Sequence, residues 1–207
     1  MQKNYLIGIS GGSGAGKTTI VKSLVNYYEN KTAVVELDSY YKDFSNLTFD
    51  DRGKINFDHP ESFDHKMLKA HINLLLKNKK IKSPIYDYKK HKRKKISKTI
   101  YPNKLIFVEG TLIFYFEEIV KFMSLKIFIH AKEKVRFTRR LNRDIIYRAR
   151  TKESIHEQYH KTVKPMYDKY VRPLKAEADL IISGESELTD NRNKIIREID
   201  SMIKGNL

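Results

Sequence analysis

Five short, mainly apolar runs recur along the chain, and none of them shows helical spacing or strict alternation with polar residues. The runs cover residues 5–9, 33–37, 105–108, 125–129 and 180–182. Runs of this kind are typical of strands in a parallel sheet whose two faces are both covered by other elements. The pattern therefore predicts a five-stranded parallel sheet.

Segments whose apolar residues recur at helical spacing lie between these runs. One covers Thr18–Tyr28, a second follows Ser62, which we expect to cap it, and a later one ends before Gly205. Another would present a face made of Val135, Thr138, Leu141 and Ile145. The alternation of strands and helices predicts an α/β fold of three layers, in which helices cover both faces of the sheet.

Residues 80–101 break this alternation, because they are dense in lysine and still contain two β-like stretches. The stretches are Ile81–Tyr88 and Lys95–Tyr101. We interpret this segment as a basic β-hairpin that projects from the core. No repeat or linker divides the chain, so we expect one domain over residues 1–207, with a helical lid at 144–158.

The charge balance indicates an anionic partner. The 207 residues contain 41 Lys and Arg against 25 Asp and Glu, a net charge of +16, which suits a phosphorylated small molecule, a nucleic acid or a membrane surface. The absence of cysteine excludes disulfides, thiol catalysis and thiolate metal sites. No run approaches the ~18 apolar residues of a membrane helix, and the first residues resemble no targeting peptide, so we expect a cytoplasmic protein with no membrane partner.

Residues 11–18 match the phosphate-binding motif G-x-x-x-x-G-K-[S/T] in full, between a predicted strand and a predicted helix. In such a loop, backbone amides and a helix N-terminus surround phosphate oxygens. We expect Lys17 to reach the β- and γ-phosphates and the Thr18 hydroxyl to bind Mg²⁺. The predicted ATP-binding residues are Gly11, Gly12, Ser13, Gly14, Ala15, Gly16, Lys17, Thr18 and Thr19.

Two acidic residues follow predicted strands, Asp38 after one and Glu109 at the end of another. The carboxyl ends of parallel strands meet at the edge of the sheet where ligands bind. Both carboxylates are therefore candidates to hold Mg²⁺ together with Thr18, directly or through water.

A row of arginines also points to phosphate. Arg136, Arg140, Arg143, Tyr147 and Arg150 follow at spacings of four, three, four and three residues, which predicts a single helical face. Asp144 is the one acidic residue in that stretch, so most of the arginines lack an acidic partner on the helix. We therefore expect them to face a polyphosphate or a nucleic-acid backbone rather than solvent.

Six further blocks accompany the phosphate loop in the order found in uridine–cytidine kinases, of the phosphoribulokinase/uridine kinase family, and the chain resembles that family from about Leu6 to Ser183. The blocks are Asp38–Tyr41, Asn56–Pro60, Pro84–Tyr88, Val108–Gly110, Arg148–Arg150 and Lys161–Pro165. The resemblance implies a P-loop kinase that transfers the γ-phosphoryl group of ATP or GTP, with Mg²⁺, to the 5′-hydroxyl of uridine and cytidine. It also implies a homotetramer.

The resemblance also implies roles for single residues. Asp38 would orient the 5′-hydroxyl as the base, with Lys17 and Arg148 acting at the phosphates. The residues implied to hold the nucleoside are Asp38, Asp58, Tyr86, Tyr88, His91, Arg140, Arg150 and Gln158. Independently of the family, Tyr86 and Tyr88 lie two positions apart on a predicted strand, and their rings would face one side as a wall for a planar base.

Ala149 departs from the family pattern, because relatives often place glycine there, and it predicts a stiffer lid turn. Two alternative functions stay open. One is a related kinase that acts on a ribulose phosphate, pantothenate or another nucleoside. The other is a P-loop protein whose basic hairpin binds RNA, although we do not expect a nucleic-acid partner.

Overall fold

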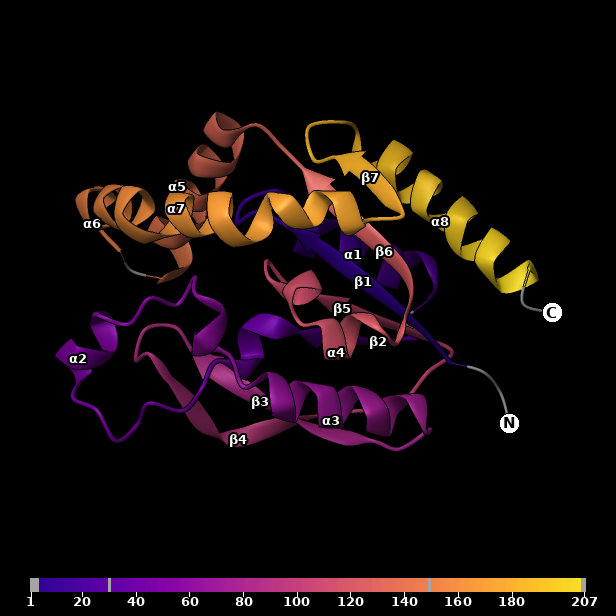
Figure 1. Ribbon diagram of the computed structural model, residues 1–207, viewed down its shortest axis with the longest axis horizontal. Coiled ribbons are helices and arrows are strands. Elements are labelled where there is room, and N and C mark those ends of the chain that lie inside the picture. The colour runs from indigo at the N-terminus through magenta and orange to yellow at the C-terminus, as the bar shows by residue number, and fades with distance from the viewer. Residues whose placement is uncertain (1–3, 30, 149, 206–207) are drawn as a thin grey trace.

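The computed structural model describes residues 4–29, 31–148 and 150–205. Its main sheet consists of five parallel strands, and the five apolar runs form them, so the predicted sheet is confirmed (Figure 1). In spatial order the strands are β2 (Thr32–Glu36), β5 (Leu105–Glu109), β1 (Tyr5–Gly11), β6 (Met123–His130) and β7 (Leu180–Ser183).

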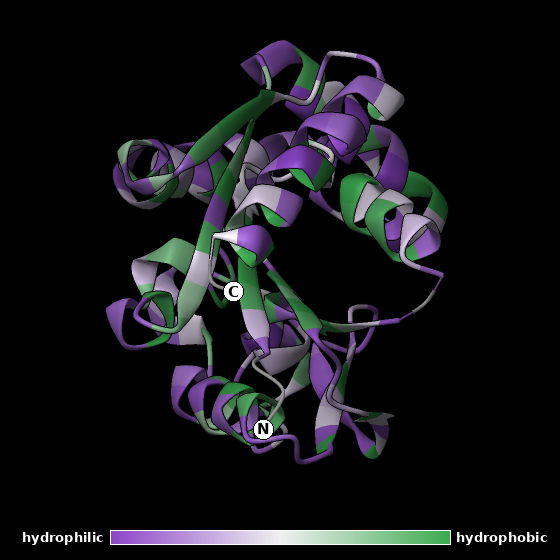
Figure 2. Cartoon of the chain, turned by 90° about the vertical axis from the view of Figure 1, so that its right-hand side faces the viewer, coloured by the Kyte–Doolittle hydropathy of each residue, from purple (hydrophilic) through white to green (hydrophobic). Residues whose placement is uncertain are grey.

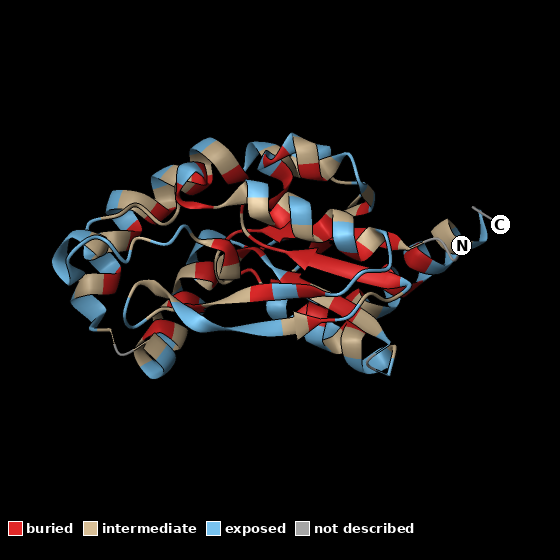
Figure 3. Ribbon diagram, turned by 90° about the horizontal axis from the view of Figure 1, so that it is seen from below, coloured by how far each residue is buried: buried red, intermediate tan, exposed pale blue. Residues whose placement is uncertain are grey.

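Helices cover both faces of the sheet, as expected. Alternate residues of β1 face opposite sides: Ile7 and Ile9 belong to one buried cluster, and Leu6 belongs to another. The helices α1 (Lys17–Tyr27) and α8 (Leu188–Lys204) pack on the first side; α3 (His65–Leu76) and α4 (Glu117–Val120) pack on the second. The strands are accordingly mostly apolar in Figure 2 and mostly buried in Figure 3. Burial of both faces supplies the main stabilising free energy of this fold.

The predicted hairpin is formed by β3 (Ile81–Asp87) and β4 (Lys92–Ile100), which pair antiparallel beside α3 (Figure 1). The second strand begins at Lys92 rather than at the predicted Lys95, because Tyr86 pairs with Arg93 close to the turn. The register shifts between this pair and the pair of Pro84 with Ser97. Residues 94–96 therefore lie outside the regular ladder and are exposed.

The prediction that Ser62 caps α3 is wrong. The Ser62 hydroxyl donates to the backbone oxygens of His59 (2.7 Å) and Phe57 (3.2 Å) in a preceding turn. The cap is Asp64, whose side chain accepts a hydrogen bond of 3.0 Å from the backbone amide of Met67. A carboxylate at this position satisfies an amide at the helix N-terminus that has no partner within the helix.

Most of the segment between β6 and β7 forms a helical layer over the P-loop. It comprises α5 (Glu133–Arg148), α6 (Lys152–Gln158) and α7 (Lys164–Met166), with π-helical turns at Tyr159–Val163 and Tyr167–Val171. Pro165 lies between the two π turns, where its missing N–H removes one α-helical hydrogen bond. The short α2 (Phe49–Gly53) lies in the loop after β2. None of the helices in the described part of the chain has the length and apolar character needed to cross a bilayer.

The expected apolar face of α5 is wrong in an informative way. Thr138 is exposed and Val135, Leu141 and Ile145 are only partly buried, whereas Arg136, Arg140 and Asp144 are buried. The buried face is charged because α5 packs over the phosphate loop rather than over the apolar sheet.

Candidate active site

The motif of residues 11–18 lies between the end of β1 and the start of α1, as its sequence predicts. Gly14 has a φ of +80°, a conformation that residues with a Cβ rarely adopt. A Cβ atom there would also lie 2.2 Å from the backbone oxygen of Arg136. The glycine thus lets the loop turn tightly beneath α5.

The side chain of Lys17 lies inside this loop. Its Nζ donates to the backbone oxygens of Gly11 (2.9 Å) and Gly12 (3.2 Å) and to the Thr111 hydroxyl (3.3 Å). Burial lowers the pKa of Lys17, while the charges of Glu109 and Asp38 oppose that shift. The ammonium group is therefore held where a phosphate chain enters the loop.

Thr18 and Glu109 together offer oxygen ligands that suit Mg²⁺. The Thr18 hydroxyl donates to Glu109 Oε1 at 2.6 Å. Burial raises the pKa of Glu109, and Lys17 opposes that rise. The charge of Asp38 also raises the pKa of Glu109, so the two carboxylates lie within electrostatic range. A cation beside these carboxylates would offset their burial and repulsion.

No group of three or more His, Cys, Asp or Glu residues suited to a metal occurs among the described residues. This is compatible with Mg²⁺, which one or two protein oxygens can hold together with water and substrate phosphates. Thr18, Glu109 and Asp38 therefore fit the ion in chemical type.

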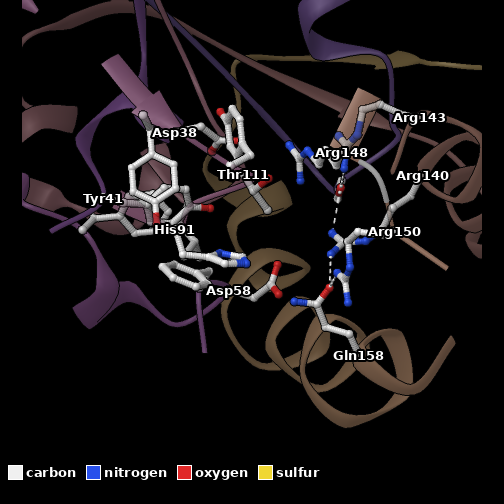
Figure 4. A pocket seen from close by; sticks show the side chains of 16 residues that line it. Asp38, Tyr41, Asp58, His91, Thr111, Arg140, Arg143, Arg148, Arg150 and Gln158 are labelled. Carbon is white, nitrogen blue, oxygen red and sulfur yellow. Dashed lines mark hydrogen bonds between the residues drawn. The ribbon is translucent and has the colours of Figure 1, made fainter. Parts of the chain in front are cut away.

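A pocket begins at the phosphate loop and ends at the hairpin (Figure 4). It contains every residue that the sequence assigned to nucleoside binding, together with Arg148. Its lining residues are Ser13, Asp38, Tyr41, Phe57, Asp58, Phe63, Tyr86, Tyr88, His91, Thr111, Leu112, Arg140, Arg143, Arg148, Arg150 and Gln158. The sequence thus predicts a set of residues that the fold brings together from separate elements.

One wall of this pocket is aromatic. The rings of Phe57 and His91 are stacked at 5.3 Å, and Tyr41 lies 5.0 Å from Tyr86 between ring centroids. Tyr88 meets Tyr86 edge-on at 5.5 Å. Burial and the charge of Arg150 both lower the pKa of His91, which favours a neutral imidazole able to donate or accept one hydrogen bond. Such a wall suits a planar heterocyclic base.

Two carboxylates lie between this wall and the phosphate loop. Asp38 belongs to a short helical turn directly after β2, and Asp58 lies in the loop before α3 (Figure 4). Burial raises the pKa of Asp58, the charge of Arg140 opposes the rise, and the charge of Asp38 adds to it. The field of Asp38 also reaches Lys17. Asp38 therefore lies within electrostatic range of both Lys17 and Asp58.

The opposite wall is cationic. Arg140 donates to the Ser13 hydroxyl at 3.1 Å and to Gln158 Oε1 at 2.9 Å. Arg150 donates to the same Gln158 oxygen and to the backbone oxygen of Ser154, so Gln158 joins the two guanidinium groups. Aspartates on one side and arginines on the other give the pocket a strong electric field across its width (Figure 4).

The expectation that Tyr147 shares the arginine face is wrong. Tyr147 is 73% exposed, whereas Arg136 and Arg140 are buried. Because α5 ends at Arg148, Arg150 reaches the pocket from beyond the helix rather than from its next turn. Arg148 stacks over the ring of Tyr88 at 4.3 Å. The lid turn at Ala149 lies outside the described residues.

Sequence reasoning missed several residues of the site. Tyr41 and Phe57 form part of the aromatic wall, and both stand inside the blocks already singled out, Tyr41 three residues after Asp38 and Phe57 directly before Asp58. Thr111 follows Glu109 at the end of β5 and contacts Lys17. Arg136 belongs to the predicted arginine row and is buried, but the sequence carries no signal for its partner, the Tyr167 ring, on which its guanidinium stacks at 3.7 Å.

A second cavity adjoins the phosphate loop on its other side. It lies between the start of α1 and the segment after β7, where Arg139 donates to the backbone oxygen of Gly184 at 2.8 Å. Thr19, predicted to bind ATP, belongs to it. Its lining residues are Ala15, Gly16, Thr19, Ile20, Ile129, Arg139, Ile182, Gly184, Ser186, Leu188 and Asn191.

Comparison with known proteins gives a consistent picture. A family model described as Phosphoribulokinase / Uridine kinase family matches residues 6–189. A uridine kinase of Clostridium novyi (strain NT) is 42% identical over 183 residues, and one of Streptococcus equi subsp. zooepidemicus is 39% identical over 183 residues; each match covers 88% of both chains. The solved structure of D-glycerate 3-kinase from Cryptococcus neoformans has the same fold, with a TM-score of 0.64, 15% identity and coverage of 90% of this chain and 88% of that one.

Proposed function

Since this chain belongs to the phosphoribulokinase/uridine kinase family, we propose that it transfers the γ-phosphoryl group of ATP to the 5′-hydroxyl of uridine. One observation carries the proposal: a single pocket runs from Ser13 of the phosphate loop to the aromatic wall of the hairpin. A nucleoside in this pocket would have its base against the aromatic rings and its 5′ end toward the loop. This arrangement brings the acceptor hydroxyl and the donor phosphate together.

The proposed roles follow from position. Asp38 orients the 5′-hydroxyl and accepts its proton, while Asp58, in the same pocket, binds the ribose hydroxyls. Lys17 and Arg148 counter the negative charge that develops on the transferring group. Tyr86, Tyr88 and His91 contact the base of the nucleoside. Arg140, Arg150 and Gln158 line the pocket opposite these aromatic residues and hold the sugar and base edges.

Thr18, Glu109 and Asp38 would hold Mg²⁺, which, when bound, neutralises charge on the β- and γ-phosphates. The second cavity, beside Thr19 and Arg139, would take the purine of the donor. Either ATP or GTP would serve as the donor. We extend the proposal to cytidine as an acceptor and, from the family resemblance, to a cytoplasmic homotetramer.

A panel of nucleosides assayed with MgATP, by following release of ADP, tests this function. We expect uridine and cytidine to be phosphorylated with kcat/KM at least about 10²-fold above purine nucleosides, since a site built around a pyrimidine leaves polar groups unpaired against the wrong base. A ribulose phosphate and pantothenate serve as acceptors for the alternative kinases. Turnover of one of these instead of uridine would overturn the proposal.

The Tyr86 hydroxyl gives a specific prediction. It is buried without a hydrogen-bond partner among the described residues, an unfavourable state that a small shift of the aromatic wall toward a bound base would relieve. We expect Tyr86→Phe to raise KM for uridine by about threefold to tenfold, because a neutral hydrogen bond contributes about 0.5–1.5 kcal/mol. His91→Ala should raise the same KM.

The matched control for that variant is Tyr28→Phe, which removes another buried hydroxyl without a partner in the described structure, outside the pocket. Its kinetics should equal those of the wild type. An unchanged KM for uridine in Tyr86→Phe would show that this hydroxyl does not contact the nucleoside.

One observation favours RNA as a second candidate ligand. Residues 77–104 hold twelve of the 41 basic residues and one of the 25 acidic residues, and thus eleven of the sixteen net positive charges. Lys94, Lys95 and Lys98 are exposed on β4. Under this candidate, changing the three to glutamine would weaken binding of single-stranded RNA and lower its salt dependence without changing uridine kinetics. Uridine turnover by a protein that does not bind RNA would exclude RNA as the ligand.

A further inference from the structure

Asp144 is a buried carboxylate surrounded by arginines. Its side chain is fully buried on the inner face of α5. One oxygen lies 2.8 Å from Nε of Arg143 and 3.5 Å from Nε of Arg148, and the other lies 3.5 Å from Nε of Arg140. The backbone oxygen of Asp144 accepts a hydrogen bond of 3.3 Å from the backbone amide of Arg150.

These four partners are the arginines that line the cationic wall of the pocket (Figure 4). Four guanidinium groups gathered on one wall repel one another and, without a counter-charge, would spread toward solvent. Burial raises the pKa of Asp144, but Arg143, Arg148 and Arg140 together lower it more, and the carboxylate is ionised. The counter-charge is therefore permanent and does not depend on a substrate.

We propose that Asp144 is a positioning residue for phosphoryl transfer, whose carboxylate fixes the guanidinium groups of Arg140, Arg143 and Arg148 in the pocket wall next to the phosphate loop. Its backbone oxygen holds the main chain at Arg150. The inference rests on the proposed function and adds a residue that does not line the pocket. Groups that are already oriented need no reorganisation when charge develops on the transferring group. Asp144 provides that orientation for Arg143 most directly, through the shortest of its contacts.

The change in pyrophosphate affinity that follows a substitution of Asp144 has opposite signs under positioning and under simple electrostatics. Asp144→Asn removes a negative charge close to the anion site, so if the arginines stayed in place the anion would bind more tightly. If Asp144 positions them, the freed arginines disperse and pyrophosphate binds more weakly. We expect the dissociation constant for pyrophosphate, measured by isothermal titration calorimetry without Mg²⁺, to rise by about tenfold in Asp144→Asn. This is the change expected for the loss of one charge-assisted hydrogen bond.

The control is Asp168→Asn, which changes another aspartate that pairs with an arginine four residues later, Arg172 at 3.3 Å, away from the pocket. Its affinity for pyrophosphate should equal that of the wild type. Unchanged or tighter binding in folded Asp144→Asn would overturn the positioning role. Should circular dichroism show Asp144→Asn to be unfolded, Asp144→Glu keeps the charge but displaces it by one methylene, and the same weakening is expected of it.

Kinetics give a second readout. Asp144→Asn should lower kcat with uridine by about 10²-fold, the cost of slightly misplaced catalytic groups, and change KM for uridine less than threefold. A loss of activity that only parallels the unfolded fraction would contradict positioning. A wild-type protein without uridine turnover would instead overturn the proposed function, and the pyrophosphate titration would still decide the role of Asp144.

Discussion

Lys17→Ala is expected to lower kcat for uridine phosphorylation by at least about 10³-fold, the upper range for loss of one preorganised donor to a developing charge. The ammonium group is already held inside the phosphate loop by the backbone oxygens of Gly11 and Gly12. When phosphates enter, it can turn to them over a short distance. Replacing the side chain with a methyl group removes the charge, so the backbone amides of the loop would bind the phosphates without the ammonium group.

The fold should survive this change. Lys17 is the first residue of α1, where alanine is an excellent helix former, and its side chain meets polar loop atoms rather than the apolar core. We expect the melting temperature, followed by circular dichroism, to shift by a few degrees at most. Lys22→Ala, at an exposed position of the same helix, is the matched control and should keep full activity. Wild-type turnover in Lys17→Ala would remove the phosphate loop from the mechanism.

The sheet could be predicted because its signal is local. Strands buried on both faces must be apolar at nearly every position, and the runs around Ile7, Phe107 and Ile127 carry that pattern openly. The phosphate loop was equally accessible, since its glycines are required by backbone geometry over eight consecutive residues. The start of β4 was misplaced because lysines at an exposed edge give no apolar alternation to read.

The site was predictable as a set of residues but not as a geometry. The family resemblance named Asp58 and Arg140, which lie 82 positions apart in sequence, yet no pattern around either residue indicates that the two line one pocket. The charged inner face of α5 reversed the usual expectation that apolar residues are buried. The charge of the buried Asp144 is offset by Arg143, Arg148 and Arg140 together, and the burial of this group becomes visible only once the helix is placed.

Asp38→Asn, the remaining large effect, is expected to lower kcat by about 10²–10⁴-fold and to change KM for uridine much less, because the amide keeps the shape of the side chain but cannot accept the proton of the 5′-hydroxyl. Asp38 lines the same pocket as Ser13 of the phosphate loop, and its charge shifts the pKa values of Lys17, Glu109 and Asp58, so we propose that the hydroxyl and the phosphate meet beside it. Asp190→Asn, at an exposed position of α8, is the control and should behave as the wild type. Steady-state kinetics with uridine and MgATP separate the two parameters. If kcat were kept and only KM rose, Asp38 would be a binding residue, and the proton would have to leave by another route.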